Sequence, residues 1–336
     1  MDAPSTIRVF PAPPIERWIE EFRGSYLASK DKATVEAYTR VLKQFAIWLA
    51  GQPGSQGQFH PRTITRTAVE IFLGTLNSSS HKNQARSAIS SFCQWLIDEK
   101  QILERNPARG INVPPQALLA PRILNEKERF AVRQVVERAN DIRGEAIFAL
   151  GYWAGCRVSD VSHLMMEHTH VTSKAGWIHV GHKGDKWRDI DLVNEARRPL
   201  YVYLTAIARE QGDGKKKQKL REPSSAYVFT SQREKIPVPE GECDGWRLME
   251  DGVHLWFQRL KKKATKEEWD LIHDITFHDL RHDFAHRARE AGWSIEEVAY
   301  YLGHITNKGT PAIQTTARYT QVSREQVKEK LKQIKG

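Results

Sequence analysis

Three histidines recur at four-residue intervals near the end of the chain. The segment 278–290 reads HDLRHDFAHRARE, so His278, His282 and His286 share one face of a helix. Two histidines at this spacing can chelate a metal ion, as in zinc hydrolases that carry glutamate directly after the first histidine. Asp279 stands there instead, with a side chain one carbon shorter. We expect no metal site here, and packing or surface positions for the second and third histidines.

Four more short motifs of polar and charged residues surround this helix in the sequence. They read GCRVSDV at 155–161, HKGDK at 182–186, LGH at 302–304 and ARYT at 317–320. Each is weak evidence alone, but together with HDLRH they stand in the order found in tyrosine recombinases. The chain resembles this family, also called the phage integrases, over roughly residues 15–322.

The resemblance implies a DNA-cleaving enzyme whose nucleophile is a tyrosine. The hydroxyl of Tyr319 would attack a DNA phosphodiester, leaving a 3′-phosphotyrosyl enzyme and a free 5′-hydroxyl. The covalent ester keeps the strand ready for rejoining, so neither ATP nor any other cofactor is expected. A phenol with a pKa of about 10 is almost fully protonated at neutral pH and needs a base. The resemblance gives that role to His278, because imidazole titrates near neutrality.

Cations are implied around the phosphate that is attacked. Negative charge builds up on the two non-bridging oxygens in the transition state, and guanidinium groups suit its stabilisation. By resemblance, Arg157 and Arg281 are these groups, and His304 supplies a further donor. Lys183 is the expected general acid for the departing 5′-oxygen, and Lys186 could substitute for it.

Two further side chains are expected to support this set. Asp160, one helical turn after the first arginine, could orient an arginine or a histidine, or it is only a charge on the helix surface. His282 lies one turn after the expected base. Among the tyrosines, Tyr319 is favoured as nucleophile over Tyr300 and Tyr301, which we expect to pack within a helix.

The sequence departs from the family pattern at two places. Residues NKGTPA at 307–312 lengthen the usually short path from LGH to the tyrosine, and we expect this loop to affect how Tyr319 enters the site. Loops at 211–225 and 237–246 lengthen the path from the hairpin to the histidine helix. Basic side chains that either contact DNA or belong to a solvated loop are Lys186, Lys215, Lys216, Lys217, Lys219 and Arg221.

Helical periodicity dominates the N-terminal part of the chain. Apolar side chains at a 3.6-residue spacing predict helices near 15–26, 34–50, 69–76 and 88–96. Four prolines in 106–121 then predict an extended linker.

The part after the linker mixes helices with one β-hairpin. The segment WIHVGHKGDKWRDIDL alternates around a glycine turn, which predicts strands at 176–181 and 187–192. Helices are predicted from Asn125, where N-x-x-E forms a capping box, and at 142–155 and 194–210. The expected fold class is mainly α with a small β-hairpin or sheet, that is, α+β.

Five regions follow from these patterns and from the resemblance. Their bounds are 1–14 (leader), 15–113 (helical, SAM-like core-binding domain for DNA), 106–121 (linker region), 122–322 (catalytic domain) and 323–336 (C-terminal helix). The last helix carries Val327, Leu331 and Ile334 on one face. This apolar face must be buried, either on a neighbouring protomer or on its own chain.

The composition fits a nucleic-acid partner. The 336 residues carry 51 Lys and Arg against 41 Asp and Glu, a formal net charge of +10. Cys93, Cys156 and Cys243 are too few and too scattered for a disulfide framework, and no apolar run is long enough to span a membrane. We expect a protein of the bacterial cytoplasm, associated with the nucleoid and not with a membrane. The resemblance implies double-stranded DNA as partner and a homo-oligomer, a tetramer on two DNA sites.

Several activities share this set of residues. Site-specific recombination between two DNA sites is favoured by the helical N-terminal domain and the apolar tail. A type IB topoisomerase would use the same chemistry to nick and reseal one strand, and a catalytically inactive relative would only bind DNA. A metal hydrolase built on the histidines would lose activity in EDTA. The biological event is left open between mobile-element integration, transposition, resolution and chromosome dimer resolution.

Overall fold

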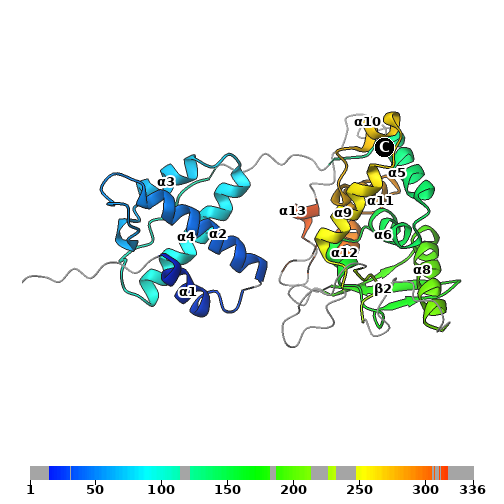
Figure 1. Cartoon of the computed structure of the whole chain (residues 1–336), viewed down its shortest axis with the longest axis horizontal. Coiled ribbons are helices and arrows are strands. Elements are labelled where there is room, and N and C mark those ends of the chain that lie inside the picture. Colours follow the sequence, from blue (N-terminus) through cyan, green and yellow to red (C-terminus); the bar gives the residue numbers. More distant parts are fainter. Residues whose placement is uncertain are drawn as a thin grey trace, which may run out of the picture. The chain divides into compact units, whose positions relative to one another are not determined.

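The computed structural model of the chain describes residues 15–30, 32–113, 122–181, 187–212, 226–231, 247–304, 306, 310 and 312–316. Its helices and strands belong to two units, Met1–Leu118 and Leu119–Gly336 (Figure 1). Each unit has a hydrophobic core of its own. The division falls within the proline-rich segment 106–121.

Helices make up the first unit. They are α1 (Ile15–Ser25), α2 (Lys32–Ala50), the short 3₁₀ turn η1 (Pro61–Thr63), α3 (Arg66–Gly74) and α4 (Ser79–Asp98). The side chains of Thr65 and Ser78 accept hydrogen bonds from the first turns of α3 and α4. Phe22, Phe92 and Trp95 contact one another in the core, where all three are buried. The four helices predicted from apolar periodicity are confirmed.

A larger set of helices makes up the second unit. They are α5 (Glu126–Ala139), α6 (Ile142–Trp153), α7 (Val158–Ser162), α8 (Asn194–Gly212), α9 (Glu250–Lys261), α10 (Lys266–Ile272), α11 (Phe277–Glu290), α12 (Ile295–Leu302) and α13 (Ile313–Thr316). The capping box predicted at Asn125 is confirmed at the start of α5. Helix α6 lies inside the unit, with most of its residues buried, and it packs against α8 and α11 (Figure 1).

One small antiparallel sheet completes the second unit. Its strands are β1 (Thr169–Val171), β2 (Gly176–Val180) and β3 (Arg188–Asp191), in the order β1-β2-β3. Ile178 and Ile190 pair across β2 and β3 and are buried, whereas the next pair, His179 and Asp189, faces outward. The predicted hairpin is confirmed. Strand β1 was not predicted, because three residues are too short to show an alternation.

Helix α11, which carries the histidine stripe, packs closely against the end of α6. Gly155 follows α6 with a positive φ of 60°. A Cβ atom at this position would lie 2.7 Å from the ring of Phe284 on α11. Only glycine combines this backbone conformation with so close an approach.

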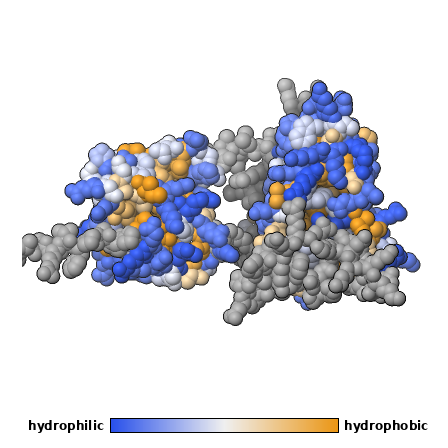
Figure 2. Space-filling view, viewed as in Figure 1, coloured by the Kyte–Doolittle hydropathy of each residue, from blue (hydrophilic) through white to orange (hydrophobic). Residues whose placement is uncertain are grey.

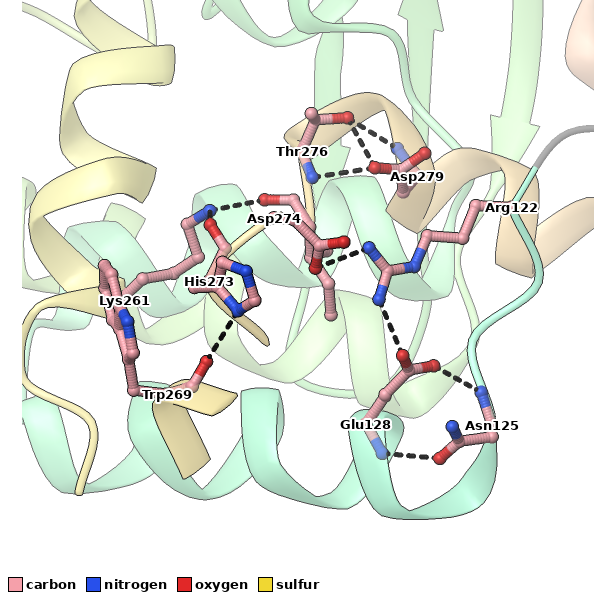
Figure 3. Close-up of polar contacts among 10 residues, drawn as sticks. Arg122, Asn125, Glu128, Lys261, Trp269, His273, Asp274, Thr276 and Asp279 are labelled. Atoms are coloured by element: carbon pink, nitrogen blue, oxygen red, sulfur yellow. Dashed lines mark hydrogen bonds and ion pairs between the residues drawn. The ribbon is translucent and has the colours of Figure 1, made fainter. Parts of the chain in front are cut away.

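The loop between α10 and α11 is held from two sides (Figure 3). Lys261 at the end of α9 is buried and donates from Nζ to the carbonyls of His273 and Ile275, at 2.6 Å each. Arg122 bridges the carboxylates of Glu128 and Asp274, also at 2.6 Å each. The start of α11 is therefore fixed by α9 on one side and by the segment that precedes α5 on the other.

On the face shown in Figure 2, the coloured surface of both units is mainly hydrophilic, with scattered apolar side chains. Among the residues that the structure describes, no helix is both long enough and apolar enough to cross a bilayer.

Candidate active site

Arg281 is the most buried cation of the site. It lies on α11 with 1% of its surface exposed, and its guanidinium donates to the carbonyls of Gly155 and Leu302 at 2.6 Å each. The nitrogen that reaches Leu302 also donates to Nε2 of His304 at 3.1 Å. These bonds tie the segment before α7 to the segment after α12, which are far apart in the sequence.

Arg157 reaches the same turn, residues 302–304. It is the N-cap residue of α7 and half-buried, and its guanidinium donates to the carbonyl of Gly303 at 3.4 Å. Arg281 contacts the residues on either side of that glycine. The structure thus brings together Arg157, Arg281 and His304, which the sequence places in three separate motifs. We call these three residues the phosphate pocket, after the group that the resemblance implies they bind.

Arg188 is a further arginine at this turn that was not predicted. It donates to the Asp160 carboxylate at 2.7 Å and to the carbonyl of Tyr301 at 3.1 Å, while Asp160 also accepts the backbone N–H of Arg157 at 2.8 Å. Burial alone would raise the pKa of the Asp160 carboxyl. The charge and hydrogen bond of Arg188, together with the charge of Arg281 and the N–H of Arg157, outweigh it and hold the pKa below its usual value. The available signal was strand alternation, because Arg188 shares the inward face of β3 with buried Ile190.

Steric constraints explain why the middle residue of the LGH motif is glycine. Gly303 adopts a positive φ of 67° as the C-cap of α12. A Cβ atom there would lie 2.8 Å from Cδ of Arg188. Glycine at this position therefore allows both the left-handed cap and the approach of the arginine.

His304 is a buried, neutral member of the pocket. Burial and the charges of Arg281 and Arg157 lower the pKa of His304 to about 3, so the ring carries a single N–H proton at physiological pH. Its Nδ1 lies 3.1 Å from Oγ1 of Thr316, and its Nε2 faces Arg281. Because arginine only donates, Nε2 accepts and the proton is on Nδ1 in this arrangement. Thr316 was not predicted.

The three histidines of the stripe all lie on α11. The rings of His278 and His282 are 4.2 Å apart between centroids, and His286 pairs with Glu290 at 3.1 Å. Partial desolvation and then the charge of Arg281 lower the pKa of the exposed His278 ring below its usual value. Burial lowers the pKa of His282 to about 4. Both rings are neutral at physiological pH.

Asp279 caps the helix that carries these histidines (Figure 3). One of its carboxylate oxygens accepts both the backbone N–H and the hydroxyl of Thr276, at 2.7 Å each, and the threonine hydroxyl accepts the N–H of Asp279 in return. The aspartate that follows His278 therefore has a structural role at the start of α11. In the described part of the chain, no group of three or more His, Cys, Asp or Glu side chains is placed to hold a metal ion.

The lengthened path after His304 returns to that residue. The backbone N–H of Ala312 donates to the carbonyl of His304 at 2.6 Å, and Thr306 and Thr310 are joined through both backbone and hydroxyl groups at 2.8 Å. Helix α13 begins at the next residue, Ile313. Ala312 therefore lies next to His304 just before α13 begins.

Other predicted residues fall where the structure gives no description. Outside the described residues lie Lys183, Lys186, Lys215, Lys216, Lys217, Lys219, Arg221, Tyr319, Val327, Leu331 and Ile334. Of the competing tyrosines, Tyr300 is 74% exposed, so its predicted packing role is wrong, whereas Tyr301 is half-buried and contacts Phe284 and Trp293.

Two family models match the chain. Residues 122–326 match the Phage integrase family, and residues 15–102 match the Phage integrase N-terminal SAM-like domain.

Known proteins resemble the chain over most of its length. Tyrosine recombinase XerD of Staphylococcus aureus (strain Mu50) is 28% identical over 307 residues, which cover 90% of this chain and 92% of that protein. The integrase of transposon Tn1549, solved with a circular intermediate DNA, has a TM-score of 0.65 at 13% identity and covers 95% and 98% of the two chains. A lambda integrase tetramer bound to a Holliday junction has a TM-score of 0.61 at 16% identity, covering 93% and 80%. The two structures share the predicted fold, helical with a small sheet.

Proposed function

The chain belongs to the phage integrase family, the tyrosine recombinases, and from this premise we propose that it cuts and rejoins duplex DNA at specific sites through a 3′-phosphotyrosyl intermediate on Tyr319. The observation that carries the proposal is the meeting of Arg157, Arg281 and His304 at the turn 302–304. Three nitrogen-bearing side chains from distant motifs are thereby offered to one anion.

The phosphate pocket suits a phosphorane-like transition state. Attack on the phosphorus places additional negative charge on the non-bridging oxygens, and fixed N–H donors bind that state more tightly than the ground state. Arg281 is already held by the carbonyls of Gly155 and Leu302, so little reorganisation is needed when charge develops. Asp160 and Arg188 support the pocket through hydrogen bonds. Asp160 binds the backbone at the start of α7, Arg188 binds the backbone near the end of α12, and the two side chains bind each other.

Protons move in balance with the two P–O bonds. His278 accepts the proton of the Tyr319 hydroxyl as the new P–O bond forms, and Lys183, or Lys186 in its place, protonates the 5′-oxygen as the old bond breaks. The lowered pKa of His278 keeps its ring ready to accept a proton at neutral pH. The free 5′-hydroxyl attacks the phosphotyrosine in the reverse step, so no cofactor is consumed.

We extend the proposal to the assembly and its DNA. A tetramer on two duplex sites is supported by the similar lambda integrase, which was solved as a tetramer bound to a Holliday junction. In this assembly residues 15–113 act as the core-binding domain, 122–322 as the catalytic domain, and helix 323–336 docks on a neighbouring protomer or on its own chain. The basic tract at 215–221 adds DNA contacts. The site of action is DNA in the bacterial cytoplasm.

The biological event is of the class carried out by XerD-like recombinases and transposon integrases. Mobile-element integration, transposition or resolution and chromosome dimer resolution all use one chemistry on different pairs of sites. Sequencing the DNA that the wild-type protein traps covalently identifies the sites, and with them the event.

A suicide-substrate experiment tests the proposed chemistry. A duplex nicked near the cleavage point loses the short 5′-hydroxyl strand after attack, so the covalent complex accumulates. The wild-type chain should give a protein–DNA adduct that survives denaturant, and Tyr319→Phe should bind the same DNA without forming the adduct. An adduct on the phenylalanine variant would refute the nucleophile.

Two further measurements separate the alternatives. Strand exchange between two labelled duplexes is expected for a recombinase, whereas relaxation of a supercoiled plasmid without exchange would indicate a topoisomerase. Cleavage should persist in EDTA, because no step uses a metal ion, and loss of cleavage in EDTA would favour a metal hydrolase.

A further inference from the structure

Thr316 joins the phosphate pocket to the segment that leads to the nucleophile. It is the last residue of α13, fully buried, with its Oγ1 3.1 Å from Nδ1 of His304. It precedes Tyr319 by three residues, a length of chain that spans at most about 11 Å. A single hydroxyl therefore connects the ring of His304 to the chain that carries the proposed attacking oxygen.

The hydrogen bonds through Thr316 run in one direction. Arg281 donates to Nε2 of His304, the proton on Nδ1 is donated to Oγ1 of Thr316, and this hydroxyl donates to the carbonyl of Ala312 at 3.2 Å. Each member of the chain has its donor and acceptor matched. The ring of His304 is thus fixed both in orientation and in tautomer.

The same hydroxyl can also serve the opposite tautomer. For His304 to donate from Nε2 to a phosphate oxygen, as expected of it in cleavage, the neutral ring must carry its proton on Nε2 and accept at Nδ1. A hydroxyl both donates and accepts, so Thr316 can turn its proton from the Ala312 carbonyl to Nδ1. That carbonyl keeps a second donor, the backbone N–H of Thr316 at 3.2 Å.

We propose, building on the function proposed above, that Thr316 is a positioning residue of the cleavage reaction. Its hydroxyl orients the His304 ring and supports either ring tautomer. Threonine and serine satisfy this requirement. Valine, which has the shape of threonine without the hydroxyl, does not.

A valine and serine pair tests the hydroxyl in the full-length protein. We expect Thr316→Val to slow single-turnover adduct formation on the nicked duplex by about 10- to 100-fold, the cost of one buried polar group left unpaired. Thr316→Ser should stay within about threefold of wild type, and DNA binding should be unchanged in both. The matched control is Thr205→Val on α8, where the hydroxyl likewise donates to the carbonyl four residues earlier, that of Tyr201, at 2.8 Å.

A spectroscopic readout does not depend on activity. In full-length protein labelled with ¹⁵N-histidine, the His304 ring signals are assigned by their loss in His304→Gln. The wild type and Thr316→Ser should show the tautomer protonated on Nδ1 with this N–H hydrogen-bonded. Thr316→Val keeps the Arg281 donor at Nε2, so its Nδ1 signal should shift because the acceptor of the Nδ1 proton is lost.

The outcomes separate this role from the function on which it depends. If the wild type forms no adduct, the proposed function fails, while the ring spectra still test the bond between Thr316 and His304. If the wild type forms the adduct and Thr316→Val matches it in rate or in ring spectrum, the positioning role is refuted. A loss shared equally by the serine variant would also refute it, since the hydroxyl would then not be the group that matters.

Discussion

Arg281 and Lys261 are two buried cations that both donate to backbone carbonyls, but we expect them to have different roles. Arg281 is 1% exposed and donates to two backbone carbonyls, and Lys261 is 6% exposed and also donates to two. The arginine has further N–H groups, one of which reaches His304 in the phosphate pocket. The lysine holds the loop before α11 and rests over the ring of Phe257. Burial is thus common to both cations. The groups around each one separate the arginine proposed to bind phosphate from the lysine that holds a loop.

The two cations also differ in the chemistry of their charged groups. A guanidinium stays charged when buried and offers five donors in a plane, so it can hold its carbonyls and a phosphate together. An ammonium loses its proton more easily in the interior, and burial lowers the pKa of Lys261. We expect substitutions at Arg281 to affect the reaction and substitutions at Lys261 to affect stability.

The largest effect is expected at Arg281. Replacement by alanine removes donors to the transition-state oxygens and should slow cleavage by about 10²- to 10³-fold or more. Adduct formation on the nicked duplex, with DNA binding measured in parallel, gives the rate. Because Arg281 is buried, Arg157→Ala at the half-buried arginine of the pocket provides a second variant, with a similar loss expected. Full activity in both arginine variants would contradict the proposed difference in role between Arg281 and Lys261.

The pH dependence of cleavage should follow His278, which lies next to the arginine site. The ring accepts the tyrosine proton only when neutral, so the rate should fall as pH drops through its pKa. That pKa is lowered, first by desolvation and then by Arg281, so the acid limb should lie below the usual value of about 6.5. The measurement is the single-turnover rate against pH, in wild type and in His278→Gln. An acid limb above that value, or one unchanged in the variant, would contradict the role of His278.

Lys261→Met should affect folding rather than the reaction. Methionine retains the length of the side chain but leaves the carbonyls of His273 and Ile275 without their donor, at a cost of about 1–3 kcal/mol in the free energy of unfolding. Denaturant unfolding measures the loss, and cleavage by the folded fraction should stay within about threefold of wild type. The control is Arg138→Ala at an exposed ion pair with Glu268, where no measurable change is expected. A cleavage loss as large as that of the Arg281 variant would make Lys261 part of the site.

The last expected effect is a loss of stability in acid. His282 and His304 have pKa values of about 4 and about 3 in the folded chain, below the unfolded value of about 6.5. Between these values the unfolded chain binds protons that the folded chain does not, so stability falls as pH drops from about 6.5 toward 4. Melting temperatures at pH 7 and pH 5 measure the fall. His282→Gln should fall less than wild type, and an equal fall would show that this ring does not contribute.

The sequence predicted those parts of the molecule that repeat a local pattern. The helices of the first unit and the hairpin at β2 and β3 follow from apolar spacing, and the cap at Asn125 from a four-residue motif. Strand β1 was not predicted, because a strand of three residues is too short to show a periodic pattern. The meeting of Arg157, Arg281 and His304 was expected from the order of motifs, and it depends on long-range packing that no single segment encodes.

Residues that act through others were harder to predict. Arg188 was visible only as a charge on the inward face of a strand, and Thr316 gave no signal, because its partner His304 lies across a loop of unusual length. In the sequence, Asp279 was compared only with the glutamate of a metal-binding motif, whereas its role in the structure is to cap α11. Such roles arise from contacts that only the folded chain defines.

The structure of the full-length protein on a cleaved duplex with vanadate at the phosphate position tests the central claim most directly. We predict that nitrogens of Arg157, Arg281 and His304 lie about 2.7–3.2 Å from the equatorial oxygens, with the Tyr319 oxygen in line on the opposite side from the 5′-oxygen. Vanadate bound away from the turn 302–304, or approached by a different hydroxyl, would contradict the account.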